Sequence, residues 1–291
     1  MRPRSIPGTI LALAAMLALI ACEPSEAPPG ADAETRAGAG AEALAGAEPA
    51  ALADIPRLTN GRPNFSGVWQ SLTTANWDLQ THGAAAGPPE YGALLATPPG
   101  PGIVVGDEIP YLPEAAAQQQ RNYENRFTDD PELKCYMPGV PRANYMPYPF
   151  QILHSDEHML IAYQFAGAAR IVNLDAHQES AIDSWMGVSN GRWEDDTLVI
   201  EVSGFNGQAW LDRAGNHASY ALRVVERYTF AGPDAIDYEA TLEDPQTFSR
   251  PWTIRFRLYR HPDPDAHLME LKCVEFTEEL LYGELYRNPA Q

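Results

Sequence analysis

Basic residues are scarce in this chain of 291 residues. Lys and Arg together number 20 against 39 Asp and Glu, so the formal net charge is -19 at pH 7. Nucleic-acid binding needs clustered Lys and Arg, and so does electrostatic docking on anionic lipid. The composition argues against both kinds of partner. An acidic surface favours solubility, or attracts cations and basic partners.

The sequence also lacks a good transmembrane span. Its first apolar run, in "MRPRSIPGTILALAAMLALIAC", is too short and too rich in alanine. Arg2 and Arg4 precede the run and small residues follow it, as in a secretory signal. Leu19-Ile20-Ala21-Cys22 resembles a bacterial lipobox, in which the thiol of Cys22 is acylated and becomes the mature N-terminus. The alternative is an ordinary secretory signal with a chance cysteine.

Bulky residues are almost absent from 23–55, which consist mainly of Ala, Glu, Pro and Gly. Such a segment cannot bury enough apolar surface to offset its chain entropy. We therefore predict a signal peptide over 1–21, a disordered tether over 22–55 and one β-rich domain over 56–291. By resemblance to bacterial sorting signals, Glu23 after the cysteine favours the periplasmic side of the outer membrane. A lipid-anchored envelope protein is the expected result.

Cysteine is rare, with three residues in all, and no Cys-x-x-Cys or Cys/His spacing suggests zinc. Two cysteines remain after the lipobox, Cys135 and Cys273. Exported proteins meet an oxidising compartment, where an even pair favours a disulfide. We predict a bridge between them, and the alternative is two unpaired thiols.

No strand–helix–strand rhythm and no internal repeat occurs, which argues against doubly wound and solenoid folds. One helix is expected over 113–127, after a loop-rich stretch over 71–112. From 150 onward the pattern is β, with short alternating runs separated by turn residues. The runs cover 150–155, 158–165, 169–175, 190–194, 197–205, 221–232, 235–244, 251–260 and 268–274. An antiparallel meander of about nine strands predicts a lipocalin-like closed barrel, with a β-sandwich as the alternative.

Gly67-Val68-Trp69 resembles the Gly-x-Trp that opens lipocalin barrels, although the chain is longer and has an insertion over 71–145. Longer segments, such as "DPELKCYMPGVPRANYMPYPFQI" and "DSWMGVSNGRWEDDTLVIEVSGFNGQAWLDRAGN", resemble a family of uncharacterised exported bacterial proteins. This likeness covers about 105–285. In that family the positions of Cys135 and Cys273 are also cysteines, which supports the bridge. The resemblance implies no activity.

No serine-nucleophile motif Gly-x-Ser-x-Gly is present. The candidate acid–base residue is instead Glu226, which falls in the middle of the apolar face of "ALRVVERYTF". A carboxylate that points inward must be paired with a buried Arg or Tyr, or lie in a cavity where its pKa is raised. The third alternative is a β-bulge that turns the side chain outward. His217 and Asp212 lie in the preceding loop. One hypothesis is a metal-independent lyase, isomerase or hydrolase in which Glu226 and His217 exchange protons and Asp212 orients the histidine. The plainer interpretation is a polar loop with a solvated histidine.

Aromatic residues crowd the second half of the chain. Lining a barrel cavity, they would hold a small apolar or aromatic ligand, and an arginine near a strand would bind a carboxylate or pair with surface acids. The expected ligand-binding residues are Trp185, Trp193, Trp210, Trp252, Tyr238 and Arg170. Aromatic filling of a β-core is the alternative. Our first hypothesis is this binding module, our second the enzyme, and our third an envelope scaffold without ligand. We expect no cofactor and no metal.

Overall fold

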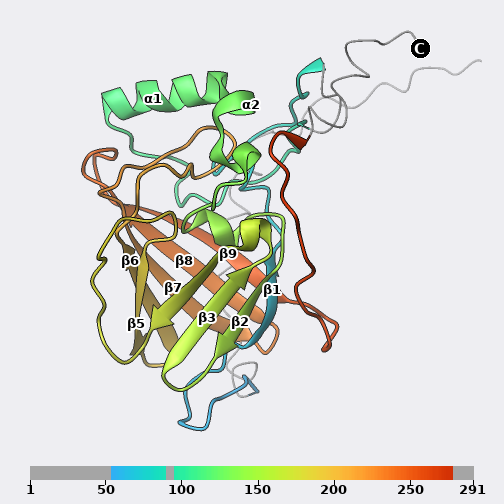
Figure 1. Cartoon of the computed structure of the whole chain (residues 1–291), viewed down its shortest axis with the longest axis vertical. Coiled ribbons are helices and arrows are strands. Elements are labelled where there is room, and N and C mark those ends of the chain that lie inside the picture. Colours follow the sequence, from blue (N-terminus) through green and yellow to red (C-terminus); the bar gives the residue numbers. More distant parts are fainter. Residues whose placement is uncertain (1–53, 90–94, 278–291) are drawn as a thin grey trace, which may run out of the picture. The chain divides into compact units, whose positions relative to one another are not determined.

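The computed structural model describes residues 54–89 and 95–277, all within one compact unit. Strands β1 to β9 form a closed barrel (Figure 1), which confirms the predicted mainly-β fold class and its barrel form. The predicted signal peptide and nearly all of the predicted tether lie outside the described residues. The strands are β1 (Gly67–Ser71), β2 (Phe150–His154), β3 (His158–Tyr163), β4 (Ala169–Asn173), β5 (Val188–Glu194), β6 (Thr197–Ser203), β7 (Arg223–Gly232), β8 (Ala235–Glu243) and β9 (Trp252–Arg260).

Strand direction follows the predicted meander at every neighbouring pair but one. β4 and β5 run parallel, with Val172 opposite Ser189 and Asn173 opposite Asn190. β1 and β9 close the ring as antiparallel neighbours. In a ring of nine strands the direction cannot alternate all the way round, so at least one pair must be parallel. Residues 174–187 connect the parallel strands β4 and β5.

The prediction of a strand over 268–274 is wrong. Residues 261–274 contain no strand, and the early β1 takes the place beside β9 instead. Two bonds to the segment around η2 hold the C-terminal residues in place. Cys273 forms a disulfide with Cys135, as predicted, and the Phe276 amide donates a hydrogen bond to the Leu133 carbonyl. No helix within the described ranges is long and apolar enough to cross a membrane.

The predicted helix is present but breaks at Asn125. It divides into α1 (Pro113–Glu124) and α2 (Arg126–Asp129), with Pro113 in the first helical turn. Both lie beyond one end of the barrel (Figure 1). Three short 3-10 turns follow them in the chain, η2 (Pro131–Lys134), η3 (Arg142–Asn144) and η4 (Phe165–Gly167).

Side chains fill the interior of the barrel. Alternate residues of the strands point inward and are almost fully buried, as the burial pattern of β7 illustrates. The insertion between β1 and β2 adds its own residues, because Asn144 and Tyr145 are also buried and the Tyr145 ring meets Phe256 edge-on at 5.8 Å. The long insertion therefore plugs the barrel.

Candidate functional site

Glu226 points into the barrel and is fully buried. Arg170 on β4 forms a bidentate ion pair with this carboxylate. Nη1 donates to Oε2 at 2.5 Å and Nη2 donates to Oε1 at 2.9 Å. Asn144 and Tyr238 also donate to Oε1, at 2.9 and 2.8 Å. Of the three alternatives for this carboxylate, the structure shows the paired one.

The pair sits in a closed polar cluster. The Arg170 Nε donates to the Tyr163 hydroxyl at 3.1 Å, and that hydroxyl donates to the Asn144 amide oxygen at 2.9 Å. Burial, together with the Glu226 charge, raises the pKa of Tyr238 well above its ordinary value. Every charged atom of the pair has a partner, so the cluster acts as a structural unit of the core.

Asp212 is buried in the loop before β7 and accepts three hydrogen bonds. Its oxygens accept from the amides of Leu79 and Asn216 at 2.8 and 3.0 Å, and from the Asn216 side chain at 2.6 Å. Burial, and then the nearby Asp78 carboxylate, raise the pKa of Asp212 to about 7. Its bonds tie the loop after β1 to the loop before β7.

His217 stacks on Tyr111, with ring centroids 5.6 Å apart, and burial lowers the pKa of the imidazole. Within residues 54–89 and 95–277, no hydrogen bond or ion pair joins the side chains of Asp212, His217 and Glu226. The structure therefore does not assemble these three residues into one site.

The predicted aromatic cluster is also spread out. Trp252 is buried against Phe248, while Trp193 stacks on Phe65. Tyr238 and Arg170 belong to the Glu226 cluster. Of the four predicted tryptophans, only Trp185 and Trp210 share a space among the described residues, and its volume is about 20 Å³. A single water needs roughly 10–15 Å³, so this space suits a water molecule and not an organic ligand.

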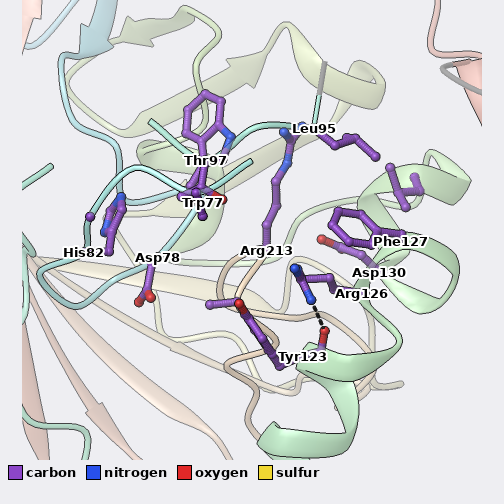
Figure 2. A pocket seen from close by; sticks show the side chains of 14 residues that line it. Trp77, Asp78, His82, Leu95, Thr97, Tyr123, Arg126, Phe127, Asp130 and Arg213 are labelled. Atoms are coloured by element: carbon purple, nitrogen blue, oxygen red, sulfur yellow. Dashed lines mark hydrogen bonds between the residues drawn. The ribbon is translucent and has the colours of Figure 1, made fainter. Parts of the chain in front are cut away.

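A larger cavity lies between the loop after β1, the α1–α2 region and the loop before β7 (Figure 2). We call it the cap cavity. Its volume is about 120 Å³, and no strand residue lines it. Its walls are formed by Trp77, Asp78, His82, Gly83, Ala85, Leu95, Thr97, Tyr123, Arg126, Phe127, Asp130, Leu133, Arg213 and Ala214.

Aromatic and charged groups face each other across the cap cavity. Figure 2 shows Trp77 and His82 on one side and Phe127 and Arg126 on the other, with Arg213 reaching between them. The Arg213 guanidinium carbon lies 5.2 Å from the centre of the Trp77 ring. This arrangement combines flat apolar walls with fixed cations, as small-molecule sites do.

A buried ion network holds one wall in place. Glu132 accepts from Arg213 at 2.6 and 2.8 Å and from Arg142 at 2.6 Å. Arg142 in turn grips Asp130 with two bonds of 3.1 Å. Burial alone would raise the pKa of Glu132, but Arg213 and Arg142 outweigh it and lower the pKa to about 2. The network fixes the position of η2 and of Arg213.

Sequence reasoning missed every residue of the cap cavity. One signal was available: Arg126 and Phe127 in "NYENRF" follow Tyr123 by three and four positions, a spacing that would put all three on one face of the predicted helix. The contribution of Trp77 and Arg213 had no such signal, because they come from loops far apart in the chain.

Among the described residues, no group of His, Cys, Asp and Glu side chains is arranged to hold a metal ion. Comparison with protein-family models, curated proteins and solved structures finds no match to this chain, so the cap cavity is interpreted from its own geometry.

Proposed function

We propose that this protein is a lipid-anchored envelope protein that binds a small ligand with one aromatic ring in the cap cavity. The observation that carries the proposal is a cavity of about 120 Å³ walled by Trp77, Tyr123 and Phe127. The size decides the class of ligand. An apolar cavity of about 150 Å³ holds one benzene, whereas drug-sized ligands need roughly 300–1,000 Å³.

We expect the ligand in the cap cavity and not in the interior of the barrel. The Glu226 cluster and the plugging segment fill the barrel, and neither cavity described above is lined by a strand residue. The barrel then serves as a rigid support for the loops that carry the site, a common division of labour in proteins. Placement in the envelope is supported by the signal-like N-terminus and by the disulfide, which is typical of exported proteins.

Benzamide is a suitable first probe, because it carries one ring and no charge. We expect it to shift the NMR signal of the Trp77 indole N–H in a saturable manner. Dissociation constants on the order of 1 mM are expected for so few heavy atoms. Cyclohexanecarboxamide has a similar size without the aromatic ring, and it should bind more weakly.

Two tryptophan variants separate the cap cavity from other sites. Trp77→Leu, followed by calorimetry because the indole signal is lost, should weaken benzamide binding roughly fivefold, because one ring wall is lost. Trp185→Leu removes a tryptophan outside the cavity and should leave binding unchanged. Absence of saturable shifts, or equal loss in both variants, would overturn the proposal.

A further inference from the structure

Arg126 differs from the other arginine of the cap cavity. Arg213 is neutralised by a bidentate pair with Glu132. Among residues 54–89 and 95–277, no carboxylate lies within ion-pair distance of Arg126. In a chain with a net charge of -19, a half-buried arginine that lines a cavity without a carboxylate partner is unexpected.

Aromatic rings fix the plane of the Arg126 guanidinium. Its central carbon lies 3.9 Å from the centre of the Tyr123 ring and 4.2 Å from that of Phe127. Figure 2 shows the guanidinium between these two residues, with Nη1 donating to the Tyr123 carbonyl at 2.6 Å. A guanidinium has five N–H donors. Within the described residues, Nε and Nη2 have no hydrogen-bond acceptor.

A rigid planar fork with unused donors matches the two oxygens of a carboxylate. We propose that the ligand of the cap cavity is an aromatic monocarboxylate whose carboxylate binds Arg126. This inference rests on the proposed function and adds the charge of the ligand to it. A monoanion fits better than a phosphate dianion, because Asp78 and Asp130 also line the cavity and would repel the larger charge more strongly.

An unpaired arginine on a surface is not unusual in itself. Arg121 on α1 also lacks a carboxylate partner among the residues described, and it donates to the Gln118 side chain at 2.6 Å. However, Arg121 is exposed and does not line the cavity. It therefore provides a matched control on the preceding helix.

The test compares benzoate with benzamide, which have the same shape but differ in charge. Binding to the full chain is followed by calorimetry and by the Trp77 indole signal. We expect benzoate to bind at least about tenfold more tightly than benzamide, since charge-assisted hydrogen bonds are roughly twice as strong as neutral ones. Arg126→Gln should abolish this preference, Arg126→Lys should retain part of it, and Arg121→Gln should leave it intact.

The outcomes distinguish the two proposals. If benzamide binds and benzoate binds no better, the carboxylate inference fails while the aromatic site stands. If neither probe binds, the site itself is wrong and both proposals fall. If Arg121→Gln reduces the preference as much as Arg126→Gln does, the effect is a general field of positive charge, and the role of Arg126 is overturned.

Discussion

At the scale of single residues, buried charges in this protein are held by several partners at once. Glu226 has a bidentate arginine and further donors from Asn144 and Tyr238. Such a cluster stabilises only as a complete set, because removing one partner leaves another charge buried and unpaired. Its position in the core makes it a structural unit on which folding depends.

Glu226→Gln should lower the free energy of unfolding by about 3–5 kcal/mol, because Arg170 would remain buried without a counter-charge. Urea denaturation measures the loss. The double variant Arg170→Met, Glu226→Gln removes the stranded cation and should recover part of it. Glu201→Gln, on the outer face of β6, is the control and should cost less than about 1 kcal/mol. A double variant less stable than the single one would contradict this account.

Glu132 should make stability depend on pH in acid. Its pKa in the folded protein is about 2, below the ordinary 4.5, so the folded state favours the charged form. The stabilisation is present above the unfolded pKa and is lost as the pH falls from about 4.5 to 2.

Denaturation of Glu132→Gln across this pH range checks the assignment. The variant should be less stable than the wild type at pH 7, and the gap should narrow as the pH approaches 2. Glu124→Gln, at the exposed end of α1, should track the wild type throughout. If the difference in free energy of unfolding between wild type and Glu132→Gln stays constant with pH, Glu132 does not titrate as described.

At the scale of elements, the insertion between β1 and β2 has two tasks. Its η3 turn plugs the barrel, and its α1, α2 and η2 elements build the wall of the cap cavity. The break at Asn125 is part of this arrangement, because Arg126 and Phe127 follow it and both line the cavity. The insertion thus contributes most of the residues that line the cap cavity.

The disulfide fastens the C-terminal segment to this insertion. Cys135 and Cys273 are 138 residues apart, so the bridge closes a long loop in the unfolded chain. Replacing both with serine should lower the free energy of unfolding by up to about 4–5 kcal/mol in the loop-entropy account. Urea denaturation with and without a thiol reductant gives an internal control. Wild type in reductant should match the double variant, and the variant should not respond to reductant.

At the scale of the whole molecule, many of the charges lie on the outer face of the barrel. Arg192 and Arg223 both pair with Glu201, and Arg255 pairs with Glu239. These exposed pairs contribute little to stability. The acidic excess remains, and it disfavours docking on anionic lipid, so we expect any membrane attachment to depend on the acylation proposed for Cys22.

Metabolic labelling with a fatty acid tests this attachment. The wild-type chain should carry label and sediment with membranes until detergent is added, whereas Cys22→Ser should carry none. The double replacement of Cys135 and Cys273 should still be labelled, because neither is the proposed acylation site. An unlabelled wild-type chain would favour the ordinary secretory signal.

Most of the β-architecture was predictable from the sequence, because alternation of apolar residues and turn chemistry are local properties. Alternation of apolar residues with a period of two predicted that Tyr228 and Tyr238 point inward. The two cysteines left after the lipobox, together with an oxidising compartment, predicted the Cys135–Cys273 disulfide. Asp212 and His217 were correctly placed in a loop, but their neighbours were not predictable.

Tertiary structure alone decided the parallel β4–β5 pair, the partner of Glu226 and the cap cavity. Each depends on contacts between residues far apart in the chain: Arg170 lies 56 positions from Glu226, and Trp77 and Arg213 come from different loops. Period and propensity describe how a residue relates to its neighbours in sequence. Ring closure, plugging and the charge balance of a cavity depend on which distant segments meet, and that is settled only when the chain packs.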